Sequence, residues 1–191
     1  MTHDNFRLLL GIQRVASNPR QLVQDSTAIG RHGTQCFFTV RFYPFLIASN
    51  HFSSTRIDDI EDGSDLRRGK PAAHIVYGTP KTITSANYVY FLQQEKIVNE
   101  FPPEHQESAL KIVIDQMLEG HIGQGMDIYW RDKWICPTEK EYKKMVIQKT
   151  GVFFTGSLQL AHLLKPDKER DKKIGKQLYR LGEVMTILFH F

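Results

Sequence analysis

The sequence has few of the features that mark a secreted or membrane-spanning protein. Its 191 residues include only two cysteines, Cys36 and Cys136, and no apolar run long enough to cross a bilayer. The most apolar stretch, residues 36–48, is short and is interrupted by Arg41 and Pro44. No apolar signal segment follows the first residues. The two cysteines could pair, but a disulfide scaffold has many more, so we expect reduced thiols and a cytoplasmic protein.

Neither positive nor negative charge predominates in the sequence. The formal net charge is +4, and 25 basic residues are interspersed with 21 acidic residues. Nucleic-acid binding needs a concentrated basic surface, so we expect no nucleic-acid partner. Residues 1–50 are the exception, because they contain arginines, no lysine and only two acidic residues. That bias resembles a mitochondrial presequence, which stays as the alternative localisation.

Acidic residues gather in one short region, where four carboxylates occupy the five positions 58–62. On a helix, residues four apart share a face, so Asp58 and Asp62 point the same way and Asp59 lies beside them. Crowded carboxylates repel one another unless a cation lies between them. Oxygen ligands without histidine or cysteine suit Mg²⁺ rather than Zn²⁺. The alternative is a solvated helix end, where acidic runs usually occur.

Two adjacent arginines, Arg67 and Arg68, follow the acidic run. Their planar guanidinium groups match the oxygens of a phosphate. Carboxylates for a metal and guanidinium groups for phosphate together indicate a diphosphate site.

The apolar spacing predicts an all-α protein, a helical bundle whose core holds a site between facing helices. Residues 1–50 show weak periodicity and turn signals, and the chain reads as helical from Phe52 onward. We expect helices over about 82–98 with Thr82 or Ser85 as cap, from Pro103 through Gly120, from a capping box at Thr138 and Glu141, and from Asp167 to the C-terminus.

Several ordered blocks of this sequence are similar to one enzyme family. They are residues 58–68, then Pro71, His74 and Tyr77-Gly78, then residues 85–91, Gly123-Gln124-Gly125-Met126-Asp127-Ile128-Tyr129-Trp130-Arg131-Asp132, and Gln148-Lys149-Thr150-Gly151. The chain resembles the trans-prenyltransferase (polyprenyl synthase) family, with animal and fungal geranylgeranyl diphosphate synthases as the nearest match. The resemblance implies an incomplete isoprenoid-synthase-like bundle, with a divergent segment over 1–50 and a partial helical domain over 51–191.

The resemblance implies Mg²⁺-dependent prenyl transfer from an allylic diphosphate, farnesyl diphosphate, to isopentenyl diphosphate, which gives geranylgeranyl diphosphate. Asp58, Asp59 and Asp62 would be the catalytic aspartates, with Asp58 and Asp62 as the metal ligands. Arg67 would bind the allylic diphosphate and Arg68 isopentenyl diphosphate. His51 matches a family histidine that contacts isopentenyl diphosphate, although a lone histidine is more often an ordinary polar side chain.

The other blocks imply further ligands on the opposite side of the bundle. Lys149 and Thr150 match a pair that contacts the allylic diphosphate, and Gln124 and Asp127 lie near the diphosphate or its metal. For Asp127 the alternative is a salt bridge next to the site. Ser53 and Ser54 stand one turn before the aspartates. Their small size predicts a deep pocket and a long product.

Three aromatic residues, Tyr88, Tyr90 and Phe91, belong to the block 85–91, and we expect them to be part of the core. Aromatic rings can stabilise a cation, but a stripe of them on a helix more often packs.

The sequence departs from the family pattern in three places. Residues 1–50 lack a Gly-Lys-x-x-Arg element, and Thr55-Arg56 replaces a pair of leucines. After Leu181-Gly182, no second Asp-Asp-x-x-Asp motif follows. These departures lead us to expect a form truncated at both ends, with apolar surface exposed. The alternative function is a catalytically inactive, diphosphate-binding or regulatory subunit. It would pair with a full-length synthase, whereas an active form would be a homo-oligomer.

Overall fold

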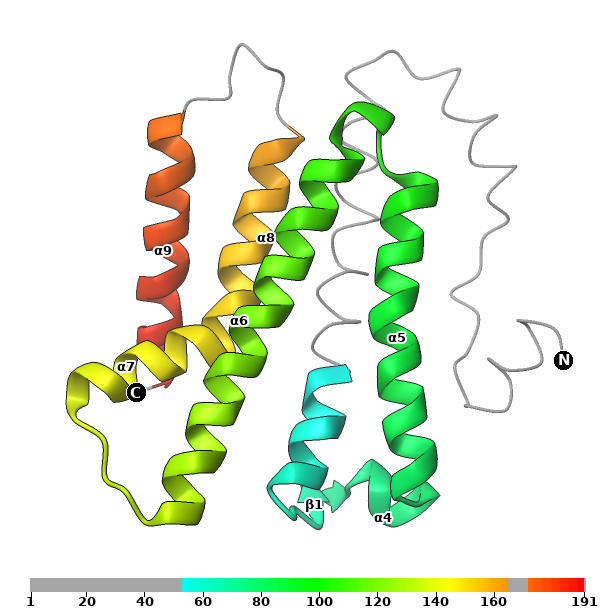
Figure 1. Ribbon diagram of the computed structural model, residues 1–191, viewed down its shortest axis with the longest axis vertical. Helices are drawn as coiled ribbons and strands as arrows, with labels where there is room; N and C mark the ends of the chain where they lie inside the picture. The colour runs from blue at the N-terminus through cyan, green and yellow to red at the C-terminus, as the bar shows by residue number, and fades with distance from the viewer. Residues whose placement is uncertain (1–52, 165–171, 191) are drawn as a thin grey trace, which may run out of the picture.

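Helices make up nearly all of the structure that the computed structural model describes, residues 53–164 and 172–190 (Figure 1). The all-α prediction is confirmed. The elements are a helix over 53–61, the hairpin β1 (Leu66–Arg67) and β2 (Lys70–Pro71), α4 (Ala73–Tyr77), α5 (Thr79–Glu100), η1 (Pro103–His105), α6 (Gln106–Lys133), α7 (Glu139–Val146), the π-helical turn η2 (Ile147–Gly151), α8 (Val152–Leu163) and α9 (Lys172–His190).

The start of α5 corrects one sequence prediction. The helix begins at Thr79, with Pro80 in the first turn, where a missing N–H is tolerated. Thr82 and Ser85 lie inside the helix, and their hydroxyl groups donate to the carbonyls of Gly78 and Lys81 rather than capping a terminus. The helix ends just before the Pro102-Pro103 pair.

The capping box at the start of α7 is confirmed. The Thr138 hydroxyl accepts the N–H of Glu141, and the Glu141 carboxylate accepts the N–H of Thr138 at 2.8 Å. The next helical turns do not stay regular, because residues 147–151 form the π-helical turn η2 before α8 begins. Such turns are rare and often lie at functional sites.

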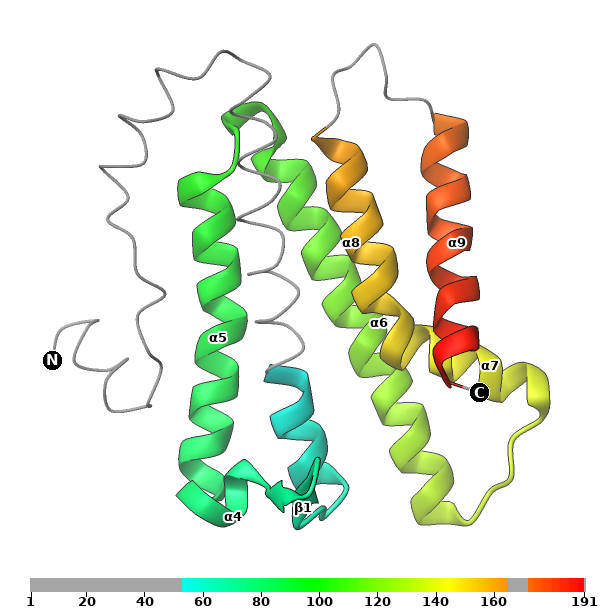
Figure 2. The same cartoon turned by 180° about the vertical axis from the view of Figure 1, so that it is seen from behind.

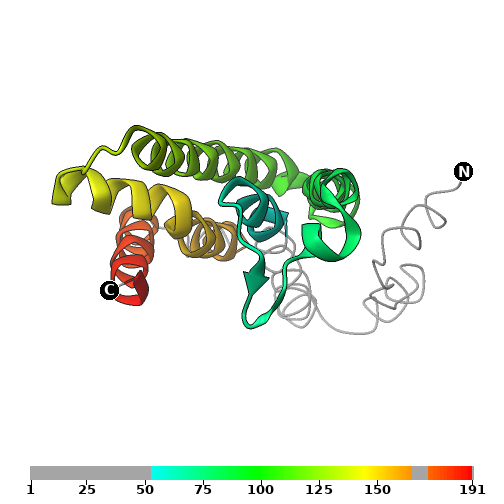
Figure 3. The same ribbon diagram turned by 90° about the horizontal axis from the view of Figure 1, so that it is seen from below.

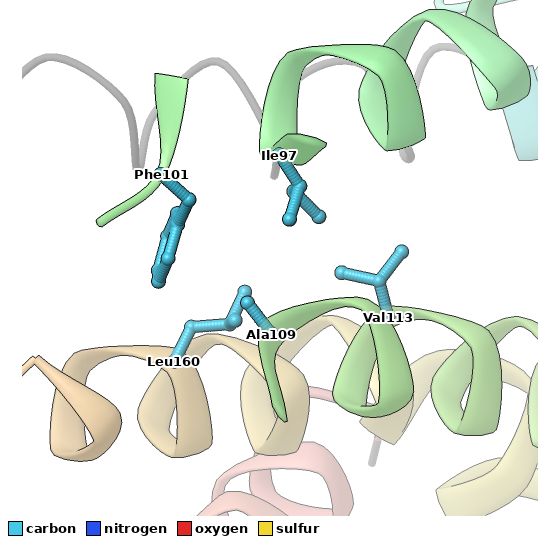
Figure 4. Close-up of a cluster of buried hydrophobic side chains, with 5 residues drawn as sticks. All are labelled: Ile97, Phe101, Ala109, Val113 and Leu160. Atoms are coloured by element: carbon cyan, nitrogen blue, oxygen red, sulfur yellow. The ribbon is translucent and has the colours of Figure 1, made fainter. Parts of the chain in front are cut away.

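The longest helix, α6, is the centre of the packing. It contacts α5, α7, η2 and α8, and α9 packs on α8 (Figures 1 and 2). Seen along the bundle, the helix over 53–61 and α8 lie next to α6, with α9 beyond α8 (Figure 3). The buried apolar cluster joins α5, α6 and α8 through Ile97, Phe101, Ala109, Val113 and Leu160 (Figure 4).

The exposed apolar surface expected from the sequence is present on the described helices. On α9, Leu181 is 48% exposed and Leu188 is 73% exposed. None of the helices in residues 53–164 and 172–190 is both long and apolar enough to cross a membrane.

Candidate functional site

A cavity of about 340 Å³ opens between the helix over 53–61, α5, α6 and the η2–α8 segment. Polar side chains that line it include Asp58, Arg67, Gln124 and Lys149. Its remaining wall is largely apolar or aromatic and includes Ile57, Tyr90, Met117, Ile128, Val152 and Phe153. A charged group and a long apolar group could therefore occupy the same cavity.

The three aspartates of the acidic run have different surroundings. Asp58 lines the cavity, whereas Asp59 is only 3% exposed and does not line it. Arg67 joins them, because its Nε donates to Asp59 Oδ1 at 2.7 Å and its Nη2 to Asp58 Oδ2 at 3.0 Å. The hydrogen bond to Asp59, more than the one to Asp58, raises the pKa of Arg67. Asp59 thus holds Arg67 in place.

Asp62 lies at the end of the same helix but outside the cavity lining. Arg131, near the end of α6, donates from Nη1 to Asp62 Oδ1 at 2.7 Å and from Nη2 to the Glu61 carbonyl at 3.1 Å. Burial, and then the charge of nearby Asp58, raise the pKa of Asp62. The two carboxylates therefore repel one another, as the sequence predicted.

Lys149 enters the cavity from the π-helical turn. Its Nζ donates to Asp127 Oδ2 at 2.7 Å and lies 3.2 Å from Asp58 Oδ1. Burial alone would lower the pKa of Lys149, but the hydrogen bond to Asp127 and the charge of Asp58 outweigh it, so the pKa is raised. Asp127 therefore forms a salt bridge, which was the alternative role given for it in the sequence analysis. Thr150 also lines the cavity.

Gly123 explains how α6 and the π-helical turn come so close. A Cβ at Gly123 would lie 2.4 Å from the backbone nitrogen of Lys149, so only glycine fits there. Gly125 lines the cavity, and a Cβ on it would meet no atom within 4 Å. Of the two glycines, only Gly123 is therefore required by the close approach of the two segments.

The small residues before the aspartates differ in position. Ser54 lines the cavity, and its hydroxyl lies 3.0 Å from the hydroxyl of Tyr90. Ser53 is fully buried outside the cavity lining, so it does not shape the wall. Tyr90 is buried, with its ring 6.1 Å from that of His121. Phe91 is 68% exposed, so its prediction as a core residue is wrong.

One further predicted ligand, Arg68, lies outside this arrangement. Arg68 is exposed on the turn of the β1–β2 hairpin with a positive φ of 52°, and it does not line the cavity. His51 falls outside the described residues. Arg56, where the family has leucine, is half-buried. Burial lowers its pKa, and nearby Asp59 opposes that shift.

Sequence reasoning missed several residues at the site. Gln124 donates to Glu61 Oε2 at 2.9 Å, so Glu61 fixes its amide beside the cavity. Glu61 belongs to the acidic run and Arg131 to the block 123–132. Both residues therefore lie within motifs from which other site residues were predicted. Nothing in the sequence pattern showed that Tyr90 and His121 would line the same wall.

The donor set fits a magnesium ion through two ligands. Within residues 53–164 and 172–190, no cluster of three or more histidine, cysteine or acidic side chains is placed to hold a metal. However, Asp58 Oδ1 is buried and accepts no hydrogen bond, its ionic partner being Lys149 Nζ at 3.2 Å, and Asp62 has a raised pKa. A cation between them would relieve both. Mg²⁺ takes one or two carboxylates and completes its shell with water and phosphate oxygens.

Comparisons with known proteins identify the family of the chain. A family model described as polyprenyl synthetase matches residues 38–191. The chain is 44% identical over 137 residues to the geranylgeranyl pyrophosphate synthase paxG of Penicillium paxilli, covering 72% of this chain and 35% of the relative. It is 51% identical over 118 residues to a terpene synthase of Matsumurasca onukii, covering 62% and 38%.

Among solved structures, the geranylgeranyl pyrophosphate synthetase of Pyrococcus horikoshii matches with a TM-score of 0.72 and 27% identity. The match covers 80% of this chain and 46% of that one. The chain spans about a third of the length of the curated relatives it matches.

Proposed function

Because the chain belongs to the polyprenyl synthetase family, we propose that its cavity binds an allylic diphosphate and serves Mg²⁺-dependent prenyl transfer. Farnesyl diphosphate would be joined to isopentenyl diphosphate to give geranylgeranyl diphosphate. The observation that carries the proposal is the meeting of Asp58, Arg67 and Lys149 at one cavity whose remaining wall is largely apolar. The names of the relatives support the same product.

The difficult step is breaking the bond between the allylic carbon and the diphosphate oxygen, because negative charge develops on the leaving group. Mg²⁺ held by Asp58 and Asp62 would supply Lewis-acid stabilisation of that charge when bound. Lys149 and Arg67 add fixed positive charges in the same place. Asp59 and Asp127 keep these two side chains in position.

The apolar wall suits the other half of the substrate. The allylic carbocation left by the departing diphosphate is attacked by the double bond of isopentenyl diphosphate, and loss of a proton completes the product. Tyr90, Met117 and Phe153 line the cavity, so they would limit the access of water to the cation. Ser54, a small residue of this wall, would leave room for the chain to grow.

A second candidate function is diphosphate binding without catalysis, as a regulatory subunit. The ion pairs favour it, because Asp58 and Asp62 are already paired with Arg67, Lys149 and Arg131. Such a chain would still hold a diphosphate through its cationic groups.

The first experiment measures binding of farnesyl diphosphate by calorimetry, with and without Mg²⁺. Asp58→Asn should reduce the Mg²⁺-dependent part of the affinity at least about tenfold, a loss of about 1.4 kcal/mol. The control is Asp115→Asn, which removes a carboxylate paired with Lys111 elsewhere on α6. Equal loss in both variants, or in neither, would contradict the proposed site.

Turnover separates the two candidates. Labelled isopentenyl diphosphate is incubated with farnesyl diphosphate, Mg²⁺ and the protein. A prenylated product that Asp58→Asn abolishes supports the enzyme. Tight Mg²⁺-dependent binding without any product supports the non-catalytic subunit.

A further inference from the structure

Arg131 is held at three points by its neighbours. Its Nε donates to Asp132 Oδ1 at 3.1 Å, its Nη2 to the Glu61 carbonyl at 3.1 Å and its Nη1 to Asp62 Oδ1 at 2.7 Å. The carbonyl belongs to the last residue of the helix over 53–61, where carbonyl groups lack partners within the helix. The guanidinium group therefore stays in place even if one contact is lost.

The contact with Asp62 differs from the other two because it occupies a proposed metal ligand. Oδ1 of Asp62 accepts the short Nη1 bond, so a cation that approached this oxygen would meet a positive charge already there. Asp62 also lies close enough to Asp58 to feel its charge. The metal-free site thus needs a counter-ion, and Arg131 supplies it.

We propose that Arg131 is an internal counter-ion which holds Asp62 in the metal-free protein and is displaced from this carboxylate when Mg²⁺ binds. Arg131 is a positioning residue that acts through Asp62. Its presence lowers the affinity for Mg²⁺ alone, so that the metal enters together with a diphosphate. The inference rests on the proposed function, since it requires Asp58 and Asp62 to bind the metal.

The chain contains its own reporters for this exchange. Its two tryptophans, Trp130 and Trp134, lie on either side of Arg131 at the end of α6. Release of Arg131 from Asp62 changes the charge next to Trp130, so intrinsic fluorescence can follow a titration with Mg²⁺ and no diphosphate. The readout does not require catalysis.

The test compares wild type with Arg131→Gln and with Lys133→Gln, in about 0.15 M KCl to screen distant charges. Lys133 provides a matched loss of charge, because it is exposed on the same helix and forms no ion pair among the described residues. We expect Arg131→Gln to tighten Mg²⁺ binding about two- to fivefold, the range of a surface ion pair, and Lys133→Gln to change it less. A purely structural role would weaken binding instead.

A double-mutant cycle with Asp62→Asn separates this inference from the proposed function. Mg²⁺ binding should weaken in Asp62→Asn, and Arg131→Gln should have no further effect in that background. If Asp62→Asn binds Mg²⁺ as wild type does, the proposed metal site is wrong. If Asp62→Asn weakens binding but Arg131→Gln does not tighten it, only the role of Arg131 is wrong.

If circular dichroism shows that Arg131→Gln fails to fold, a second measurement on the wild-type protein tests the same proposal. The Nε–H signal of Arg131 in wild-type protein, identified by its loss in Arg131→Lys, is followed by NMR during the titration. A shift that saturates with Mg²⁺ supports displacement. An unchanged signal, while the Asp58 and Asp62 backbone signals move, overturns it.

Discussion

At the scale of single residues, neighbouring carboxylates of one motif have different roles. Asp59 is buried and holds Arg67, whereas Asp58 faces the cavity and Asp62 is held by Arg131. The charges of Asp58 and Asp62 are only partly compensated by cations. Without a metal and a diphosphate, the site therefore retains unfavourable repulsion between these two carboxylates.

Asp62 should make the metal-free protein less stable at neutral pH. Its pKa is raised in the folded state above the ordinary 3.8, chiefly by burial and then by Asp58. The protonated form therefore favours folding, and this contribution is present below the ordinary pKa and lost as pH rises through the folded one. Asp62→Asn should raise the free energy of unfolding near pH 7 by less than about 1 kcal/mol, and change little near pH 3.

Urea unfolding in the presence of a chelator measures both values. Adding Mg²⁺ and diphosphate should reverse the order near neutral pH, because only the wild type gains a ligand. A variant less stable than wild type at neutral pH without metal would show that the pair with Arg131 outweighs the repulsion from Asp58.

Ser54 should set how long a prenyl chain the cavity accepts. Ser54→Phe places a ring against Tyr90 and removes the hydrogen bond between the two hydroxyl groups. Binding of farnesyl diphosphate should weaken about tenfold, while the shorter geranyl diphosphate loses less. Calorimetry with both ligands tests this. Thr84→Phe is the control, because Thr84 is exposed on α5 outside the cavity lining.

At the scale of elements, the contact between α6 and the π-helical turn decides where Lys149 stands. Gly123→Ala would force a Cβ to within 2.4 Å of the Lys149 backbone nitrogen. We expect a loss of about 1 to 3 kcal/mol in the free energy of unfolding, the usual range for overpacking. Gly125→Ala should instead stabilise the helix by about 0.5 to 1 kcal/mol, since its Cβ meets nothing within 4 Å.

Thermal or urea unfolding of the two alanine variants provides the measurement. Because the glycines are two residues apart on one helix, the opposite signs cannot come from helix propensity alone. Equal effects would mean that α6 and the π-helical turn separate easily.

The elements that the sequence predicted well are those with local signals. The capping box at Thr138 needs only its own turn. The helix expected from Pro103 through Gly120 is present, but it begins at Gln106 and continues to Lys133. The start of α5 was missed because Pro80 outweighed the expected cap at Thr82. The π-helical turn was not predicted from the sequence, and Gly123 packs closely against it.

The site residues that the sequence predicted are likewise those that belong to short motifs. The resemblance identified Asp58, Arg67 and Lys149, and the structure brings them together at the cavity. The pairing of Arg131 with Asp62 joins residues 69 positions apart, and only the tertiary fold sets such a distance. The exposure of Phe91 likewise follows from which face of α5 meets α6, which the periodicity of an aromatic stripe left open.

At the scale of the whole molecule, one apolar cluster joins α5, α6 and α8. Ile97 is fully buried in it, whereas its neighbour Val98 is 50% exposed. Ile97→Ala should lower the free energy of unfolding by about 2 to 5 kcal/mol, because a cavity is left in the core. Val98→Ala, the control, should change it by less than about 0.5 kcal/mol. Urea unfolding followed by circular dichroism distinguishes them.

The π-helical turn holds one residue more than the α-helical turn that it replaces. Removing a single residue from 147–151 would let the segment close as an α-helix, and the helices on either side would keep nearly the same rotation, because the wider turn takes up the extra residue. The side of α8 that holds Thr155 against Gln116 and Leu160 in the core would then keep its neighbours. The extra residue therefore serves the cavity wall at Lys149 more than the packing of the bundle, and a deletion there should change ligand binding more than stability.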